Sequence, residues 1–201
     1  AYLLLLGKLP TSSELAEFED ELMNQRTMPD SLVSVVESIP ASAHPMEVVR
    51  TIISYMGVIE PEKSFDDQLT IAKRLIGVTT TAIVYWYNFS HNGVKVSQDS
   101  GERSVAGHFL KLLRQEDIPE LDKKTLDVSL TLYAEHEFNA STFTGRVCAS
   151  TLSDLHSCLT AAVGSLRGPL HGGANEEAMK MLQQINSVEE VRSFVDQKFE
   201  N

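Results

Sequence analysis

Apolar side chains recur every three or four residues through the middle of this 201-residue chain. Between positions 69 and 87 the recurring residues are Leu69, Ala72, Ile76, Thr79, Ile83 and Tyr87. This spacing matches the turn of an α-helix and predicts a long helix from about residue 69 to Ser90. Residues 78–89 are also rich in β-branched and aromatic side chains, which favour strands. We prefer the helix, because the neighbouring periodicity continues through this segment.

Helix-start signals lie on both sides of this segment. The run Thr11-Ser12-Ser13-Glu14 is a capping box that opens a helix to about Asn24. The pair His44-Pro45 places proline at a first helical position and opens a helix to about Ile59. The remaining helix-start and helix-stop signals predict helices over residues 30–40, 104–115, 120–143, 153–166, 174–185 and 188–199. The sequence therefore predicts an all-α protein.

Acidic residues outnumber basic ones, and the formal net charge is −11. Nucleic-acid binding requires a basic face and membrane-surface binding a polybasic patch, so neither partner is expected. No apolar run approaches the roughly 20 residues of a membrane span. Residues 1–8 lack the flanks of a signal peptide, and we interpret them as the end of a buried helix. A cytoplasmic protein is expected.

The cysteines and histidines show no metal-binding spacing. Cys148 and Cys158 form no Cys-x-x-Cys pair and predict no disulfide framework. A zinc-protease helix starting at His136 would need a second histidine where Ala140 stands. We therefore predict no metal site. Nucleotide-binding loops of the Walker and Gly-x-Gly-x-x-Gly types are also absent from the sequence.

A glycine- and proline-rich turn places a histidine just before a predicted helix. The run is Arg167-Gly168-Pro169-Leu170-His171-Gly172-Gly173-Ala174-Asn175. Glycine lets a ligand approach the backbone closely, and proline stiffens the turn. A helix that begins near Gly173 would aim free N–H groups at an anion beside His171. The alternative interpretation is a helix–helix turn with a surface histidine.

A second candidate site is the run Glu135-His136-Glu137-Phe138-Asn139-Ala140-Ser141-Thr142. On a helix, His136 and Asn139 would be neighbours on one face and could present an imidazole and an amide to one polar ligand. The alternative is a core histidine bonded to a neighbouring helix.

The other histidines and the central aromatic residues are given structural interpretations. His44 is expected to cap a helix, His91 to lie in a helix-ending turn and His156 to lie on a helix surface. His108 belongs to a helical apolar pattern. The run 85–87 (Tyr-Trp-Tyr) is expected in the core or at an interface rather than in a cofactor site.

Taken together, His136 in HEFNAST and His171 in GPLHGGAN resemble the citrate synthase family. Supporting runs are Gly7-Lys8-Leu9-Pro10, His44-Pro45-Met46, Val49-Arg50-Thr51, Tyr85-Trp86-Tyr87, Ser90-His91-Asn92-Gly93 and Tyr133-Ala134. The resemblance covers essentially all 201 residues but only the middle part of such an enzyme. It implies an all-α, multi-helical homodimer. Residues 1–168 would form most of the large domain and residues 169–201 the start of the small domain, entered through Gly168-Pro169.

The resemblance also implies an activity, the condensation of an acyl-CoA with oxaloacetate followed by hydrolysis of the thioester. In that reaction His171 hydrogen-bonds the thioester carbonyl, and His136 binds oxaloacetate. We expect Asn139 to support His136, from their helical spacing. The supporting runs favour propionyl-CoA as the acyl substrate, and acetyl-CoA is the alternative. The acyl-CoA is a substrate, and no tightly bound cofactor is expected.

Several family residues fall outside this sequence. By resemblance, a second catalytic histidine, the catalytic aspartate and the arginines that clamp oxaloacetate lie beyond residue 201. We therefore expect the natural chain to extend further. If it does not, the alternative is a non-catalytic helical dimerisation scaffold. The residues that bind the CoA phosphates are not assigned, although Arg146 and Arg167 lie near the two motifs.

Overall fold

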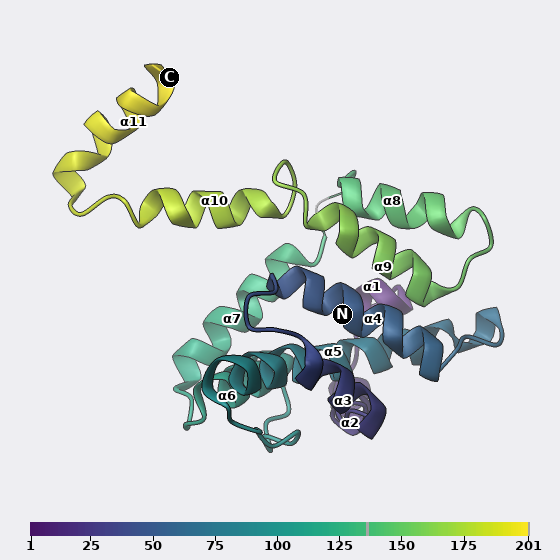
Figure 1. Cartoon of the computed structure of the whole chain (residues 1–201). Coiled ribbons are helices and arrows are strands. Elements are labelled where there is room, and N and C mark those ends of the chain that lie inside the picture. Colours follow the sequence, from purple (N-terminus) through teal and green to yellow (C-terminus); the bar gives the residue numbers. More distant parts are fainter. Residues whose placement is uncertain (136, 201) are drawn as a thin grey trace.

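A computed structural model describes residues 1–135 and 137–200, and helices dominate it (Figure 1). The α-helices are α1 (Tyr2–Leu6), α2 (Ser12–Asn24), α3 (Asp30–Ser38), α4 (Pro45–Ile59), α5 (Gln68–Asn92), α6 (Val105–Arg114), α7 (Glu120–Tyr133), α8 (Ala140–Ala149), α9 (Leu155–Leu166), α10 (Gly173–Leu182) and α11 (Val191–Glu200). Short 3₁₀ turns, η1 (Phe65–Asp67) and η2 (Val188–Glu190), precede α5 and α11. No strand occurs in these two described stretches, and the all-α prediction is confirmed.

Helix α5 is the central element, and α2, α3, α4 and α6 pack around it. Its buried side chains include Trp86, which is 1% exposed, and its indole N–H donates to the carbonyl of Ile39. The strand-like composition of residues 78–89 is overridden, because this helix buries its apolar residues against several neighbours. Gly93 ends α5 in the left-handed conformation, with a φ of 69°.

Local capping chemistry sets several helix boundaries where the sequence predicts them. The Thr11 side chain accepts from the Glu14 backbone N–H, and the Glu14 carboxylate accepts from the Thr11 backbone N–H. His44 caps α4, since its Nδ1 accepts from the backbone N–H of Met46 at 3.1 Å. The capping predictions for α2 and α4 are confirmed.

The predicted helix over residues 120–143 is wrong, because two helices occupy this range. Helix α7 ends at Tyr133, and α8 begins at Ala140. Asn139 has an extended backbone, with a ψ of 151°, and its side chain accepts from the Thr142 backbone N–H. Asparagine favours such N-cap positions over helix interiors, because its side chain competes for backbone hydrogen bonds. Glu137 is also left-handed, with a φ of 64°.

The apolar start of the chain is helical but not buried, so the expectation of a buried helix is wrong. Leu3, Leu4 and Leu6 of α1 are all exposed. The Tyr2 ring contacts the Phe18 ring edge-on, with ring centroids 5.3 Å apart. Because the other described helices leave three of the four leucines of α1 open to solvent, the apolar sequence alone did not determine burial.

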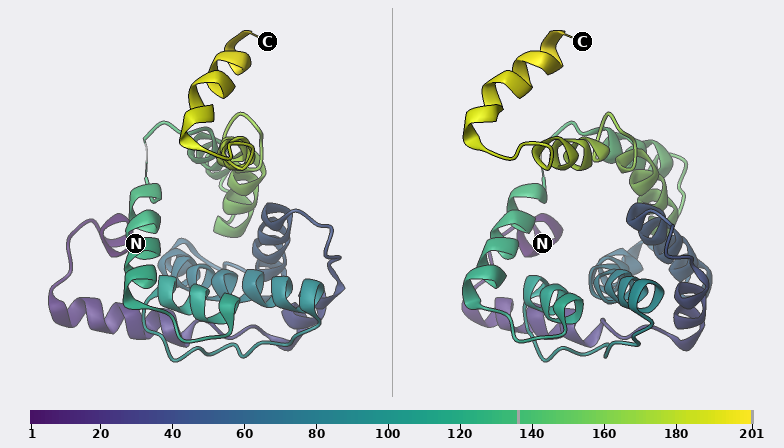
Figure 2. Two further views of the ribbon diagram at one scale, coloured as in Figure 1. Left: turned by 90° about the vertical axis from the view of Figure 1, so that its left-hand side faces the viewer. Right: turned by 60° about the vertical axis from the view of Figure 1, so that its left-hand side comes forward.

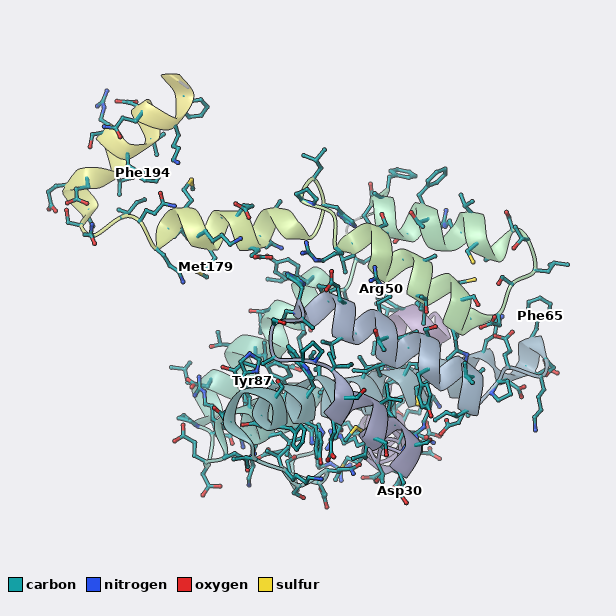
Figure 3. The ribbon with its side chains drawn as sticks, viewed as in Figure 1. Asp30, Arg50, Phe65, Tyr87, Met179 and Phe194 are labelled. Carbon is teal, nitrogen blue, oxygen red and sulfur yellow. The ribbon has the colours of Figure 1, made fainter. Side chains whose placement is uncertain are left out.

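Helices α8 and α9 run back along one another, and α9 packs on α4 (Figure 1). After α9 the chain turns and projects away from the core as α10 and α11, which two further views also show (Figure 2). Met179 and Phe194 lie on this projecting arm, far from the core (Figure 3). The arm begins beside the predicted domain boundary at residues 168–169. Within the described stretches, no helix is both long and apolar enough to cross a bilayer.

Candidate functional site

The two candidate motifs meet where the start of α8 faces the turn before α10. The ring Nε2 of His171 lies 2.9 Å from the hydroxyl oxygen of Ser141 and 3.3 Å from the Ser141 backbone nitrogen. Ser141 belongs to the HEFNAST run, so His171 contacts the second motif directly. His136 itself lies outside the described residues.

Asn139 extends the contact between the motifs into a chain of polar groups. The Ser141 hydroxyl donates to Asn139 Oδ1 at 2.7 Å, and the same oxygen accepts from the Thr142 backbone N–H at 2.7 Å. The Ser141 backbone N–H donates to His171 Nε2, so this nitrogen is an acceptor and the proton of the neutral ring is on Nδ1. This chain orients the imidazole with respect to the start of α8.

The helical position predicted for Asn139 is wrong. Asn139 precedes α8 and lies outside any helix, so it cannot share a helix face with position 136. Its described role is to cap α8 and to hold the Ser141 hydroxyl. Substrate binding by Asn139 stays a prediction. Sequence reasoning missed Ser141, although its position two residues after a potential capping asparagine was visible in the sequence.

The turn that carries His171 is closed by its own backbone. The His171 N–H and the Gly173 N–H both donate to the Gly168 carbonyl, at 3.0 and 3.2 Å. The N–H groups of Ala174 and Asn175 donate to the carbonyls of His171 and Gly172. The expected anion site at the start of α10 is therefore wrong, because these first N–H groups already have carbonyl partners.

Glycine is required in this turn by close packing. A β-carbon on Gly172 would lie 2.5 Å from the carbonyl oxygen of Leu166, and one on Gly173 would lie 3.0 Å from that of Gly168. The φ of Gly172 is −63°, which any residue adopts. The turn folds back tightly on the end of α9, and this packing fixes where His171 stands.

Two arginines lie beside the motifs. Arg146 lines a cavity of about 360 Å³ that is formed mainly by the residues around HEFNAST. The described lining residues are Glu135, Glu137, Phe138, Asn139, Thr142, Phe143 and Arg146. The Nε of Arg167 is buried and has no hydrogen-bond partner in the described part of the chain. Arg146 therefore lies at the candidate site, whereas Arg167 is near it in the sequence, and neither has a described role there.

Two other histidines are buried and act in the packing of the core. His108 lies between the hydroxyls of Thr81 and Ser100, with Nε2 and Nδ1 at 2.9 and 2.8 Å from them. Burial, together with the charge of Arg26, lowers the pKa of His108 to about 4.

His156 was expected on a helix surface, and this expectation is wrong. The residue is only 2% exposed. Its ring packs onto Gly57 of α4, where a β-carbon would lie 2.8 Å from His156 Cβ. Burial lowers the pKa of His156. Gly57 has no side chain, and this leaves the space on α4 that the His156 ring occupies.

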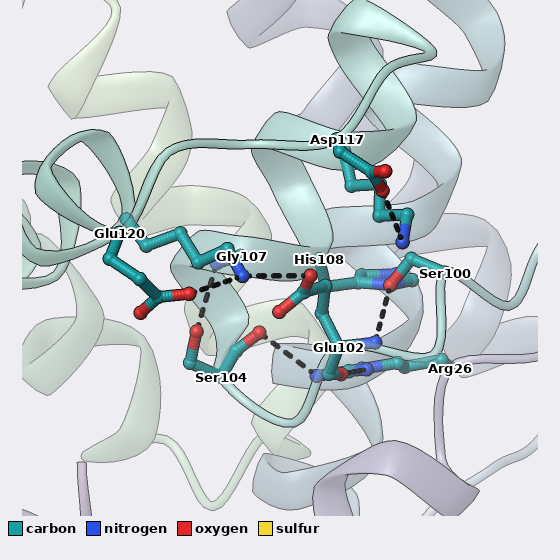
Figure 4. A network of polar contacts seen from close by, with 10 residues as sticks. Arg26, Ser100, Glu102, Ser104, Gly107, His108, Asp117 and Glu120 are labelled. Atoms are coloured by element: carbon teal, nitrogen blue, oxygen red, sulfur yellow. Dashed lines mark hydrogen bonds and ion pairs between the residues drawn. The ribbon is translucent and has the colours of Figure 1, made fainter.

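A polar network lies away from the two motifs and ties the 93–104 loop to the core (Figure 4). The guanidinium of Arg26, which is 3% exposed, donates to the carbonyls of Glu102, Arg103 and Ser104 at 2.5, 2.9 and 3.2 Å. Lys123 of α7 pairs with the carboxylates of Glu102 and Glu120, both at 2.9 Å. The network restrains the loop and was not predicted, because nothing in the local sequence marks Arg26 as buried.

The described residues contain no group of three or more histidine, cysteine or acidic side chains that could hold a metal ion. Cys148 and Cys158 are both free. Burial and the neighbouring Cys148 raise the pKa of the Cys158 thiol to about 11, so this thiol stays protonated at neutral pH.

Comparison with known proteins places the chain in one family. The family model described as "Citrate synthase, C-terminal domain" matches residues 1–201. The 2-methylcitrate synthase of Shewanella oneidensis is 52% identical over 200 residues, which cover 100% of this chain and 53% of that protein. The citrate synthase of Deinococcus radiodurans is 38% identical over 201 residues, which cover 98% of this chain and 53% of that protein. The chain belongs to the citrate synthase family.

Solved structures agree with this assignment. A citrate synthase from Thermoplasma acidophilum, in a ternary complex with carboxymethyl coenzyme A and oxaloacetate, superimposes with a TM-score of 0.87 at 28% identity. The match covers 98% of this chain and 52% of that one. The citrate synthase of Thermotoga maritima superimposes with a TM-score of 0.82 at 33% identity. That match covers 99% of this chain and 52% of the Thermotoga maritima chain. The present chain spans about half the length of the relatives it matches.

Proposed function

We propose that these residues form part of an acyltransferase that condenses propionyl-CoA with oxaloacetate to give 2-methylcitrate and CoA. The contact between His171 and Ser141 carries the proposal, because it joins two motifs that are far apart in the sequence. The 52% identity to a protein named 2-methylcitrate synthase supports propionyl-CoA as the acyl substrate.

In the proposed reaction His171 donates a hydrogen bond to the thioester carbonyl. Such a donor stabilises the negative charge that develops as the α-carbon loses a proton. The contacts of Ser141 with His171 Nε2 keep the ring oriented while that charge forms, and Nδ1 carries the proton that is donated to the carbonyl. His136 binds oxaloacetate. By resemblance, the carboxylate base and a second catalytic histidine lie outside these 201 residues.

Acetyl-CoA is the alternative acyl substrate, and the 38% identity to a protein named citrate synthase supports it. One methylene in a hydrophobic pocket is worth only about 1–3 kcal/mol, so turnover of both thioesters is expected. The test measures CoA release by the natural protein that carries these residues, with saturating oxaloacetate and each thioester in turn. A kcat/KM about tenfold higher for propionyl-CoA is expected. A higher value for acetyl-CoA would reject propionyl-CoA as the preferred substrate.

A second test separates an enzyme from a helical dimerisation scaffold. His171→Ala should lower turnover by about two to four orders of magnitude, the range for a positioned acid–base group. His136→Ala should mainly raise the KM for oxaloacetate. If the natural protein released no CoA from either thioester, that result would favour the scaffold.

We also propose a homodimer in the cytoplasm, with the large domain ending near residue 168 and the small domain beginning at residue 169. Large apolar side chains exposed on and beside α8 support an interface there. These side chains are Phe138, Phe143, Val147 and Leu152. No metal and no tightly bound cofactor is proposed, and the CoA thioester enters as a substrate. Sedimentation velocity of the natural protein tests the dimer, and a monomer at micromolar concentration would reject it.

A further inference from the structure

One side-chain contact connects the projecting helix α10 to the body of the molecule. The Nε2 of His44, at the start of α4, lies 2.9 Å from Oε2 of Glu176 on α10. Within the described residues, this is the one side-chain hydrogen bond or ion pair between α10 and any residue before 168. The two side chains are 26% and 43% exposed. The contact therefore lies at the surface, where it is easily formed and broken.

The capping role of His44 determines which of its two ring nitrogens carries the proton in the neutral ring. Nδ1 accepts the Met46 backbone N–H, so it carries no proton itself. In the neutral ring the proton is then on Nε2, which donates to the carboxylate. Lys180 also pairs with Glu176, at 2.8 Å, and Lys180 and His44 together lower the pKa of Glu176 to about 2. The acceptor is thus charged at neutral pH, which makes the hydrogen bond stronger than one between neutral groups.

The bond between His44 and Glu176 completes a closed circuit of connected elements, α4, α9, the turn that carries His171, and α10. Helix α9 packs on α4, and the 167–173 turn joins α9 to α10. The carbonyl of His171 accepts the N–H of Ala174, so the histidine moves together with the start of α10. The bond between His44 and Glu176 returns from α10 to α4. Breaking this bond leaves α10 held to α9 only through the turn.

We infer that His44 is a positioning residue, which acts through Glu176 and α10 to hold the His171 turn in place relative to α4. The effect on catalysis rests on the function proposed above, whereas the effect on α10 does not. No contact between His44 and a substrate is needed for either effect.

Two substitutions of His44 separate capping from positioning. The amide of asparagine can take the place of Nδ1 and is a favoured helix cap, but it does not reach Glu176. The amide of glutamine can take the place of Nε2 and donate to Glu176, but glutamine is not among the favoured caps. His44→Asn therefore keeps the cap and removes the link to α10. His44→Gln keeps the link and weakens the cap.

Hydrogen exchange of the amides of residues 176–182 tests the link without reference to activity. We expect His44→Asn and Glu176→Ala each to speed exchange about tenfold, the effect of losing one hydrogen bond to a charged group. The double variant should exchange no faster than the single variants, because both remove the same bond. Glu177→Ala is the control, since Glu177 pairs with Lys180 and not with His44. Unchanged exchange in both His44→Asn and Glu176→Ala would overturn the inference.

Steady-state kinetics of the natural protein then test the consequence for His171. His44→Asn should lower kcat about three- to tenfold while leaving the KM for oxaloacetate unchanged. His44→Gln should keep kcat near the natural value and lower the melting temperature. A purely structural role of the cap predicts the opposite order, with glutamine the less active variant, and would overturn the positioning role. If the natural protein releases no CoA, the proposed function fails, and hydrogen exchange still decides whether His44 holds α10.

Discussion

The carbonyl oxygen of Leu166 lies 2.5 Å from the point where a β-carbon on Gly172 would stand. The backbone at Gly172 is therefore packed closely against Leu166, the last residue of α9. Since His171 directly precedes Gly172, this close packing also determines where the imidazole lies. The glycine is required by space, because its backbone angles are those of ordinary helix.

Gly172→Ala should therefore destabilise the protein and displace His171. Forcing a methyl group into packed space costs about 1–3 kcal/mol in unfolding free energy. Urea unfolding measures that loss, and CoA release measures the displacement. The control is Gly164→Ala on α9, where an added β-carbon meets nothing within 4 Å. This substitution should raise stability by about 0.5–1 kcal/mol. Equal losses of stability in both variants would contradict the packing argument.

Ser141→Ala removes the hydroxyl that joins His171 to Asn139. We expect turnover to fall about tenfold, the equivalent of one hydrogen bond of about 1.4 kcal/mol. Ser141→Thr keeps a hydroxyl and should retain most of the activity. The control is Ser150→Ala at the other end of α8, whose hydroxyl donates to the Val147 carbonyl. Steady-state CoA release measures all three variants, and equal turnover of Ser141→Ala and the natural protein would show that the chain of polar groups is not needed.

His108 should make stability fall as the pH is lowered. Burial holds its folded-state pKa at about 4, below the ordinary value of 6.5, so the unfolded state binds more protons between these two values. The unfolding free energy therefore falls as the pH drops from about 6.5 to 4, by roughly 3 kcal/mol for a shift of this size. His156, whose pKa is also lowered, adds to the same slope.

Urea unfolding at several pH values measures this slope. His108→Gln should reduce the slope in this window, even though the variant is less stable at every pH. His91→Gln, which alters an exposed ring in the last turn of α5, is the control. An unchanged slope in His108→Gln would show that this histidine does not carry the pH dependence.

Arg26→Lys should loosen the loop over residues 93–104. The N–H groups of a lysine ammonium all lie on one nitrogen atom. They cannot reproduce the planar guanidinium, whose two terminal nitrogens donate to three carbonyls. The buried carbonyls left without a donor cost about 1–3 kcal/mol each, so a loss of at least 2 kcal/mol is expected. Limited proteolysis should then cut the loop faster. Arg103→Lys, at a half-exposed ion pair, is the control and should change stability by less than about 1 kcal/mol.

Helix boundaries were predictable where the chemistry that sets them is local. The capping pair Thr11 and Glu14 lies within one turn, and His44 caps through a nitrogen two residues away. The break before α8 follows the same rule, since Asn139 is a favoured cap. The prediction of one helix over residues 120–143 placed this asparagine inside a helix instead of at its start.

Features that depend on distant residues were not predictable. The burial of His156 requires Gly57 on another helix, and the burial of Arg26 requires the carbonyls of a distant loop. Free N–H groups were expected after His171 because the first N–H groups of a helix have no carbonyl partner within it, but here the turn folds back and supplies those carbonyls. The pairing of the two motifs was expected from the family resemblance, and the residue that mediates it, Ser141, emerged only from the fold.

The only tryptophan, Trp86, lies in the core, whereas helices α7 and α10 bury none of their side chains. Helices without buried contacts are marginal in water and lose their hydrogen bonds first. On warming, the ellipticity of the molecule should therefore decline before its indole fluorescence changes. The two optical signals would give different midpoints, and neither alone would describe the melting of the whole chain.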